Sequence, residues 1–530
     1  MTSHPSRRAA PGTRRRIAAF TAALMLVPVM AAAQGGDAEE RAARYLDAVR
    51  GEPGALGIFI REMPKGADLH SHLSGAIYAE SYLRWAAEDG LCIDTRRLAI
   101  VFAQPCAPSD TLRPAAAVPD TSVLYGRLVD AMSMRNWDST RISGHDQFFS
   151  TFGRFNSTDR RGGDMLAEAA TRAILGRVTY LELMSTPDRR AARTLGDAAG
   201  WTEDFARMRD TLLALGLPAV GRAASARLDS VEARRDTVLG CGTARPQAGC
   251  EVETRWIYQV SRGNPPQQVF AQILLGFLMT RADPSVVGLN LVQPEDGEVS
   301  MRDYSLQMRM IQYLRSVHPD VQVTLHAGEL APGLVPDEGL RFHISEAVTV
   351  AGARRIGHGV DVLHERDAQA LLGEMARREV MVEIALSSND LILGIRGPAH
   401  PLHAYMAAGV PVALATDDEG VSRSEMTLEY LKAVRDQNLG YPALKTMART
   451  SLQHAFVQGE PLWRDLDALT PAPACARSAG GLEGARCDRF VARSPRARLQ
   501  RDLERRFAAF ERQAAQMLAA PVPAGAARRP

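Results

Sequence analysis

The stretch VQVTLHAGE, Val321 to Glu329, contains the pattern from which the fold can be predicted. Apolar and polar residues alternate up to Leu325, as they do in a half-buried β-strand. The strand then ends on His326, and Gly328 and Glu329 follow. A histidine and an acid at the end of a buried strand indicate a chemical site, provided that other strands supply partners.

Seven further runs in the chain are typical of strands, and many of them are separated by segments with the 3.6-residue period of helices. They are Ala67–His72, Val178–Met184, Trp256–Val260, Val286–Val292, Arg355–His358, Val380–Leu386 and Pro411–Thr416. Eight strands that alternate with helices predict an α/β fold with a parallel sheet closed into a (β/α)₈ TIM barrel. We expect this barrel to carry insertions, an N-terminal helix and a C-terminal helical extension.

The chain divides into five expected regions. They are a signal peptide at 1–33, a helical lead-in at 34–62, the barrel at 63–455, a C-terminal helical extension at 456–519 and a disordered tail at 520–530. A composition of 46% hydrophobic and 23% charged residues is ordinary for a globular protein with a sizeable core.

The N-terminus has the pattern of a cleavable export signal. Five arginines precede the apolar stretch Ile17–Ala33, which ends in three alanines. Thr21 and Pro28 interrupt that stretch, which argues against a stable membrane anchor. We therefore expect export to the periplasm or secretion, with cleavage near Ala33, and both the general and the twin-arginine routes stay open.

Charge and cysteine content agree with an exported, small-molecule protein. Removing the five signal arginines changes the formal net charge from +2 to −3, which argues against a nucleic-acid or anionic-membrane surface. The six cysteines form three pairs that are close in sequence, which suits three disulfides in an oxidising compartment, although six cysteines allow 15 pairings. The expected pairs are Cys92 with Cys106, Cys241 with Cys250, and Cys475 with Cys487.

Residue types that bind metals or act as acids and bases lie at, or just after, the ends of four predicted strands. TIM barrels place their catalytic residues at these carboxyl ends. The residues are His70 and His72, then His326 and Glu329, then His358, and finally Asp417 and Asp418. The period of two in a strand directs His70 and His72 to the same side, so that both can bind one cation. Three imidazoles and one carboxylate suit a zinc site with water as a further ligand.

Each residue type also has a purely structural interpretation. Asp417 and Asp418 suit a turn or a helix N-cap, His358 between two glycines suits a buried core histidine, and Glu329 suits the start of a helix. The coincidence of four strand ends at the catalytic side of one barrel favours the chemical interpretation.

Four ordered segments carry a resemblance to a known family. They are MPKGADLHSHLSGA (Met63–Ala76), LHAGE (Leu325–Glu329), RIGHGV (Arg355–Val360) and ATDDEG (Ala415–Gly420). These segments resemble the signature motifs of the adenosine deaminase family of metal-dependent amidohydrolases. The export signal and the segment VVGLNLVQPED (Val286–Asp296) are most similar to the secreted, growth-factor-related branch.

The resemblance implies one Zn²⁺ per chain, bound by His70, His72, His326 and Asp417. It further implies that Glu329 donates a proton to the purine N1. His358 would orient or deprotonate the attacking water, and Asp418 would hold that water and the purine N7. Gly328 would let the substrate approach the backbone. The implied activity is hydrolytic deamination of adenosine or a related 6-aminopurine (deoxy)nucleoside.

The substrate-recognition positions depart from the family pattern. Ser74 stands where the motif has an aspartate that contacts the ribose, Gln293 replaces a glycine that contacts the purine, and Asn290 replaces an aspartate. Glu419 replaces the usual proline after the paired aspartates. Adenine, deoxyadenosine, a modified adenosine and other aminated heterocycles therefore stay open as substrates, and Ser74, Asn290 and Gln293 are the candidate contacts.

Other interpretations remain open. His145 and the aromatic residues Phe148, Phe149, Phe152 and Phe155 suit either a pocket wall over the base or plain core. A two-metal hydrolase bridged by a modified lysine is disfavoured, because no lysine occurs in Pro284–Asp296. A secreted nucleoside-binding protein without activity is the alternative that is not an enzyme. No pattern in the sequence indicates the oligomeric state.

Overall fold

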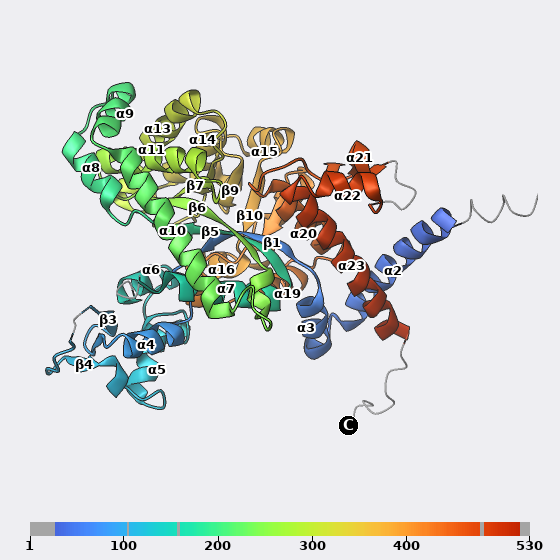
Figure 1. Ribbon diagram of the computed structural model, residues 1–530, viewed down its shortest axis with the longest axis horizontal. Coiled ribbons are helices and arrows are strands. Elements are labelled where there is room, and N and C mark those ends of the chain that lie inside the picture. The colour runs from blue at the N-terminus through green and yellow to red at the C-terminus, as the bar shows by residue number, and fades with distance from the viewer. Residues whose placement is uncertain (1–26, 103–104, 156–159, 477–481, 520–530) are drawn as a thin grey trace, which may run out of the picture.

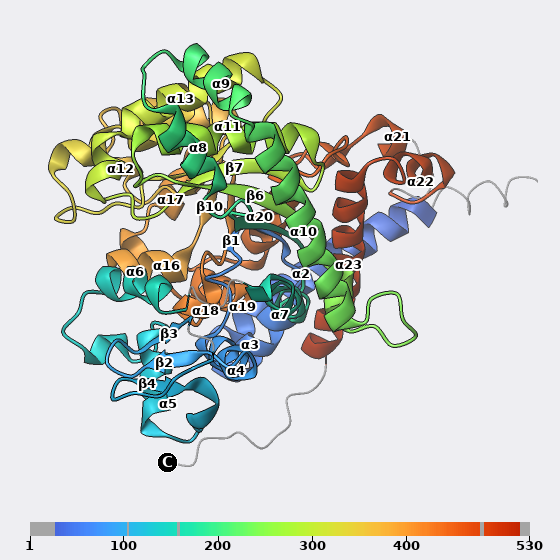
Figure 2. The same ribbon diagram turned by 60° about the vertical axis from the view of Figure 1, so that its left-hand side comes forward.

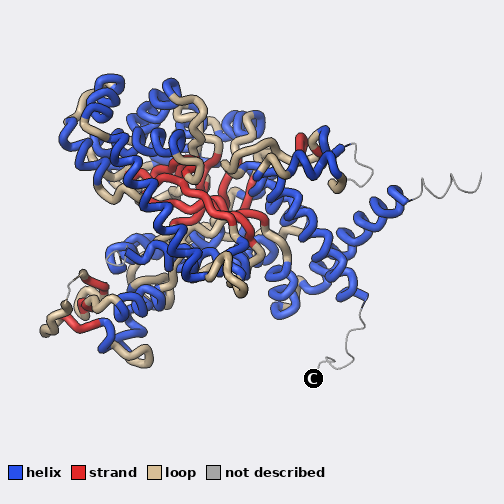
Figure 3. Tube along the Cα trace, in the orientation of Figure 1, coloured by secondary structure: helices blue, strands red, loops and turns tan. Residues whose placement is uncertain are grey.

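The computed structural model describes residues 27–102, 105–155, 160–476 and 482–519. At its centre lie eight parallel strands surrounded by helices (Figure 3). The strands are β1 (Gly66–His72), β5 (Val178–Ser185), β6 (Glu253–Ser261), β7 (Val286–Val292), β8 (Thr324–Ala327), β9 (Arg355–His358), β10 (Met381–Ile384) and β11 (Val412–Leu414). All eight predicted strands are therefore present.

The eight strands form two four-stranded parallel sheets, with the orders β1-β5-β6-β7 and β8-β9-β10-β11. Single parallel bridges join their edges, from Ser71 to Asp417 and from Leu289 to Val323. The two sheets thus close into the predicted barrel, which brings the carboxyl ends of all strands to one rim. The strands are buried because helices cover the outside, which explains their nearly continuous apolar runs.

The helices between successive strands form the outer layer of the barrel (Figure 1). They are α7 (Gly162–Leu175), α8 (Ala191–Ala199), α9 (Phe205–Ala214), α10 (Leu217–Leu239), α11 (Pro266–Ala282), α12 (Glu298–Arg302), α13 (Tyr304–Val317), α14 (His343–Thr349), α15 (Ala368–Arg377), α16 (Leu386–Leu393) and α17 (Leu402–Ala407). After β11 follow α18 (Glu419–Ser422), α19 (Met426–Arg435) and α20 (Tyr441–His454).

An insertion between β1 and β5 lies to one side of the barrel, below it in the view of Figure 2. It consists of helices α4 (Ala79–Glu88), α5 (Val123–Ala131) and α6 (Gly144–Phe155) with a small antiparallel sheet of β2 (Cys92–Asp94), β3 (Ala99–Val101) and β4 (Leu112–Pro114). The disulfide Cys92–Cys106 connects β2 to the segment between β3 and β4.

The chain ends pack together on another side of the barrel. Helices α2 (Val27–Val49) and α3 (Pro53–Glu62) meet the C-terminal α23 (Pro495–Ala519), and both views show α2 and α23 side by side (Figures 1 and 2). The rings of Phe59 and Phe510 have centroids 4.9 Å apart. The apolar stripe predicted for the last helix is buried at Leu499, Leu503 and Phe507.

The C-terminal extension also contains a short hairpin and two short helices. They are β12 (Trp463–Asp465), β13 (Thr470–Pro471), α21 (Pro473–Ala476) and α22 (Ala485–Val491), with the disulfide Cys475–Cys487 between the two helices. Together with Cys241–Cys250, all three predicted disulfides are confirmed. The predicted signal segment up to residue 26 and the predicted tail 520–530 lie outside the described residues. None of the described helices has the length and hydrophobicity of a bilayer span.

Several predicted strand bounds differ from the structure. The fifth strand was expected to start at Val321 but β8 starts at Thr324, and the eighth was expected to run to Thr416 but β11 ends at Leu414. The seventh strand was expected to run to Leu386, but β10 ends at Ile384 and α16 begins at Leu386. Ser388 and Asn389 therefore project from the first turn of a helix. This helix starts at the rim because the buried Glu429 carboxylate accepts a hydrogen bond from the Ser387 backbone N–H.

Candidate active site

Three histidine side chains converge inside the rim of the barrel. His70 and His72 project from β1, and His326 projects from β8. The Nε2 atom of His326 lies 3.1 Å from that of His70 and 3.3 Å from that of His72. The structure therefore brings together the three imidazoles that the sequence places on two distant strands.

Each of the three imidazoles contacts an oxygen atom through its Nδ1. The pairs are His70 with Glu383 Oε2 at 2.6 Å, His72 with Gln259 Oε1 at 3.1 Å, and His326 with Asn290 Oδ1 at 3.0 Å. Each oxygen accepts a hydrogen bond from Nδ1–H. In the neutral ring Nε2 then carries no proton and keeps its lone pair. Three lone pairs that face one another require a positive charge between them.

Asp417 supplies an anionic atom to the same point. Its Oδ1 lies 3.3 Å from His72 Nε2 and 3.5 Å from His70 Nε2, and it has no hydrogen-bond donor among the described residues. Its Oδ2 accepts a hydrogen bond of 2.7 Å from Ser388 Oγ. Asp417 adopts φ 58°, a left-handed conformation that is costly for an aspartate and recurs at functional sites.

A proton or a metal ion can provide the missing positive charge. Burial opposes the charged ring, but the nearby carboxylates of Asp417 and Glu383 raise the pKa of His70 to about 10. A divalent cation would replace that proton. Possible ligand atoms of His70, His326, His358 and Asp417 lie within 4.8 Å of one another, and so do those of His72, Asp417 and Asp418. The three Nε2 atoms of His70, His72 and His326, one unpartnered carboxylate oxygen and an oxygen acceptor behind each of these imidazoles fit a zinc-type cation.

Glu329 is buried beside this cluster, in surroundings that favour the neutral form of its carboxyl group. Burial, together with the negative charges of Asp417 and Glu295, raises the pKa of Glu329 well above its usual range. Its backbone N–H donates to Glu295 Oε2 at 2.9 Å, and the Gly328 N–H donates to Glu295 Oε1 at 3.0 Å. Glu295 therefore fixes the turn that positions Glu329.

The structure gives Gly328 a further reason, which the sequence did not reveal. This glycine has φ 77°, and a Cβ there would lie 2.5 Å from Asp361 Oδ1 and 2.6 Å from Ile344 Cδ1. The nearest atoms thus belong to side chains of the barrel. Gly328 is required by a left-handed turn in a crowded interior, whatever approaches the site from outside.

His358 lies at the end of β9, with its Nε2 3.7 Å from Glu329 Oε1. A chain of hydrogen bonds determines which of its nitrogens carries the proton. The Leu402 N–H donates to His400 Nδ1, the His400 Nε2 contacts Asn389 Oδ1 at 3.0 Å, and Asn389 Nδ2 contacts His358 Nδ1 at 2.9 Å.

The backbone N–H at the start of this chain can only donate, so each later partner has a defined role. His400 Nδ1 accepts, its Nε2 donates to Asn389, and Asn389 donates to His358 Nδ1. Burial lowers the pKa of both His358 and His400 to about 4, so both rings are neutral at pH 7. His358 therefore presents an N–H on Nε2 towards the site.

Asp418 completes the rim next to Asp417. Burial raises the pKa of Asp418 well above its usual range, and the charge of Asp417 adds to the effect. Its Oδ1 has no partner among the described residues. A Cβ at Gly75 would lie 1.4 Å from that oxygen, so the glycine in the first motif leaves the space that Asp418 occupies.

The three candidate substrate contacts are placed differently from one another. Ser74 is exposed and lines a cleft beside the histidines. Gln293, at φ 85°, is exposed at the end of β7, and its Oε1 accepts a hydrogen bond from the Gly263 N–H. Asn290 is fully buried and its Oδ1 also accepts from the His326 backbone N–H, so we revise its role to positioning of His326.

The aromatic helix α6 contains both core and rim residues. Phe148 and Phe155 are buried, whereas Phe149 and Phe152 are partly buried. His145 Nε2 lies 3.1 Å from Asp296 Oδ1, which connects α6 to the loop after β7. Both interpretations of this segment therefore hold in part. Its buried phenylalanines belong to the core, and its first turn contacts a loop at the rim where the histidines lie.

Sequence reasoning missed the buried ion pairs below the histidines. Arg355 Nε lies 2.6 Å from Glu383 Oε1, and Arg355 Nη2 lies 2.7 Å from Glu182 Oε2. Burial would raise the pKa of Glu383, but the charge of Arg355 and the hydrogen bond from His70 lower it. The sequence feature that could have revealed these pairs is a single acid within an apolar strand, as in MVEI and VTYLELM, because a buried carboxylate needs a partner.

Comparison with known proteins agrees with this arrangement. The family model described as adenosine deaminase matches residues 221–466. The matched segment, slightly less than half of the chain, is therefore similar to the adenosine deaminase family. That segment includes His326, Glu329, His358, Asp417 and Asp418, while β1 with its two histidines lies before it.

Curated relatives include deaminases of two purines. An adenine deaminase of Rhizobium johnstonii is 27% identical over 223 residues, which are 42% of this chain and 62% of the relative. An adenosine deaminase of Escherichia coli is 31% identical over 147 residues, which are 28% of this chain and 41% of the relative. The chain therefore spans less than two thirds of the length of these relatives.

A solved structure supports the fold. The crystal structure of an adenine deaminase from Arthrobacter aurescens matches with a TM-score of 0.50 and 18% identity. The match covers 77% of this chain and 97% of that one. The barrel of this protein is thus the deaminase-type TIM barrel with additional segments.

Proposed function

We propose that the protein is a metal-dependent aminohydrolase that deaminates adenosine or a related 6-aminopurine (deoxy)nucleoside to the inosine-type product and ammonia. The observation that carries the proposal is the convergence of three imidazole Nε2 atoms and Asp417 beside the buried carboxyl of Glu329. The family match and the purine deaminases among the relatives support it.

His70, His72, His326 and Asp417 would hold one metal ion, for which zinc suits the donor set. Bound there, zinc would lower the pKa of a water molecule enough to supply hydroxide near neutral pH. The protein groups around the ion then provide the remaining requirements of the reaction, which are proton delivery, orientation and exclusion of bulk water.

Glu329 is the proposed proton donor. Hydrolysis forms a C–O bond at the purine C6 and places electron density on N1, which must be protonated before ammonia leaves with the C6–N bond. An ordinary glutamate is ionised at pH 7, but burial and two neighbouring carboxylates raise the pKa of Glu329 well above its usual range. A raised pKa favours the protonated carboxyl group that the role requires.

His358 and Asp418 act on the attacking oxygen and on the ring. Since Nε2 of His358 carries a proton, it donates a hydrogen bond to an oxygen that develops negative charge. Of the two roles that the resemblance implies, this favours orientation over deprotonation. Asp418, with its raised pKa and its unpartnered Oδ1, suits a hydrogen bond to the attacking water or to N7.

The proposed location of this enzyme is outside the cytoplasm. Three disulfides among the described residues are consistent with folding in an oxidising compartment. We infer that the chain is exported to the periplasm or secreted, within or close to the secreted branch of the family. N-terminal sequencing of the mature protein tests this, with Gln34 as the expected first residue.

A substrate screen with zinc-loaded protein tests the activity. It should include adenine, adenosine, 2′-deoxyadenosine, AMP and methylthioadenosine, with purine absorbance and released ammonia as readouts. Turnover of at least one of them is expected. Turnover of a different aminated heterocycle alone would indicate a related amidohydrolase, and binding without any turnover would favour the nucleoside-binding alternative.

A further inference from the structure

A cleft of about 420 Å³ adjoins the three histidines on the side of β5 and β6. Its inner end is formed by Leu73 and Ser74, which follow His72, and by Gln259, whose Oε1 contacts His72 Nδ1. Met184, next to His72 in the strand register, lies on the same wall. A substrate with its reacting ring at the histidines therefore extends into this cleft.

The outer part of the cleft is cationic. Arg160, Arg189, Arg227 and Arg234 line it, and no carboxylate does so among the described residues. Arg234 is neutralised by Asp164, at 3.0 Å. Arg160 and Arg227 line the cleft without an ion-pair partner among the described residues, so no carboxylate neutralises them there. The Arg160 guanidinium lies 4.8 Å from the centroid of the Phe102 ring, a contact that leaves its charge in place.

Arg227 is held by the protein while most of its hydrogen-bond donors remain available. One Nη1 N–H donates to the Pro187 carbonyl across the cleft. A guanidinium has five N–H donors in a planar fork, which matches the oxygens of a phosphate. Ser185, Thr186 and Ser230 add hydroxyl groups to the same wall.

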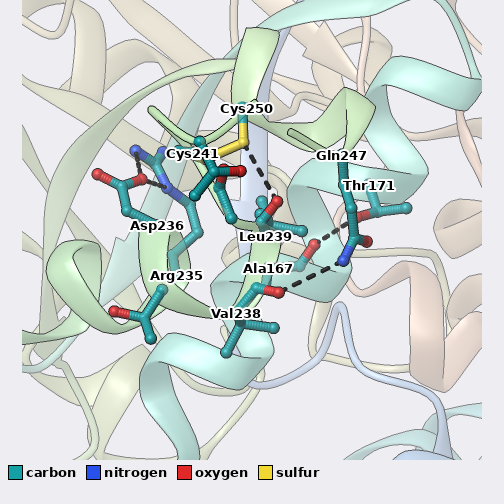
Figure 4. The surroundings of a disulfide bond; sticks show 12 residues. Ala167, Thr171, Arg235, Asp236, Val238, Leu239, Cys241, Gln247 and Cys250 are labelled. Carbon is teal, nitrogen blue, oxygen red and sulfur yellow. Dashed lines mark hydrogen bonds and ion pairs between the residues drawn. A yellow bond between two sulfur atoms is a disulfide. The ribbon is translucent and has the colours of Figure 1, made fainter. Parts of the chain in front are cut away.

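Helix α10, which carries Arg227, is fixed at both sides of the cleft. At Gly162 and Gly163 of α7 a Cβ would lie 2.9 Å from Val231 and 2.4 Å from Arg234, so the two helices pack closely. Figure 4 shows the disulfide Cys241–Cys250 at the end of α10, where Gln247 Nε2 donates to the Val238 carbonyl. The arginine is thus presented on a rigid wall.

We propose that this cleft binds the 5′-phosphate of the substrate, so that the preferred substrate is a 6-aminopurine nucleoside monophosphate and not the free nucleoside. The proposal rests on the proposed deaminase function, since the base must lie at the histidines. A phosphate monoester carries about −1.5 to −2 charges at pH 7. The unpaired guanidinium groups of Arg160 and Arg227 complement that charge without any lysine or metal.

A kinetic comparison of AMP with adenosine tests the phosphate site. The wild type should show a kcat/KM for AMP at least about tenfold above that for adenosine, and R227Q should lower the ratio of the two values about 10- to 100-fold. R222Q is the matched control, because Arg222 is exposed on the same helix and does not line the cleft. Equal kcat/KM values in the wild type and an unchanged ratio in R227Q would overturn the proposal.

Equilibrium binding separates this proposal from the deaminase function. Calorimetry of the zinc-loaded protein with the products IMP and inosine should give a tighter dissociation constant for IMP, and R227Q should remove most of the difference. If no purine is turned over but IMP still binds more tightly, the deaminase function fails and the phosphate site stands. If inorganic phosphate binds as tightly as IMP, the cleft is a general anion site and the proposal is wrong.

Discussion

The Glu383 carboxylate lies 2.6 Å from Nδ1 of His70, on the opposite side of the imidazole from the other two histidines. The same carboxylate accepts hydrogen bonds from Thr324 Oγ1 at 3.0 Å and from Arg355 Nε at 2.6 Å. A carboxylate on β10 therefore fixes the orientation and the protonated nitrogen of His70 on β1. The proposed metal site would thus depend on a buried network that extends across the barrel.

E383Q should weaken metal binding. The amide is a poorer acceptor for His70 Nδ1–H, and such a change behind a metal-binding histidine costs about 10- to 100-fold in affinity. Competition with a chromophoric zinc chelator measures the constant. E338Q is the control, because Glu338 is exposed. An unchanged affinity in E383Q would mean that the network does not support the metal.

E329Q should abolish most turnover while the metal is retained. Removing a general acid costs about 10²- to 10⁴-fold in rate. The metal should stay bound because Glu329 is not one of the four proposed ligands. H326A should instead lose metal and activity together. Elemental analysis and steady-state kinetics on both variants distinguish the two roles. Near-normal rates in E329Q would refute the proposed proton donor.

N389D should reverse the tautomer of His358. A carboxylate accepts from both neighbouring histidines, so the His358 proton moves to Nδ1 and Nε2 loses its donor. Loss of one hydrogen-bond donor to a developing oxyanion costs about 10²-fold in kcat. ¹⁵N NMR of the histidine rings reports the tautomer directly, with N438D as the control at an exposed site. A full rate with the reversed tautomer would exclude the donor role.

The buried Glu429 predicts a pH dependence of stability. Burial raises its pKa from 4.5 to about 6, despite hydrogen bonds from the Ser387 N–H and the Ser424 hydroxyl. A raised carboxyl pKa stabilises the folded protein below the unfolded-state value and loses that contribution as pH rises through the folded-state value. Between pH 4.5 and pH 6.5 the wild type should lose about 1.5 kcal/mol of unfolding free energy relative to E429Q.

Urea titration of the wild type and E429Q at both pH values measures this difference. Using the two proteins at each pH cancels the contributions of all other titrating groups. A difference in unfolding free energy that is the same at pH 4.5 and pH 6.5 would show that Glu429 has the same pKa in the folded and unfolded states, so that burial does not raise it.

The sequence alone determined the barrel, the order of its strands and the residues at their carboxyl ends. Strand alternation and helix period are local properties, so runs such as Val321–His326 or Val286–Val292 can be recognised without any knowledge of their neighbours. Cysteine spacing likewise predicted the three disulfides, because each pair closes a short loop. The resemblance to a family then assigned roles to these residues.

Only the tertiary structure decided how those residues act. Asn290 supports His326 instead of facing the substrate, Gly328 is required by Asp361 and Ile344, and the Leu402 N–H fixes the proton on His358. Arg160 and Arg227 are far apart in the sequence, and only the folded chain places both of them in the lining of one cleft. Proton positions, pKa shifts and the charge of a cleft depend on distances between strands that are far apart in the chain, and no local pattern encodes them.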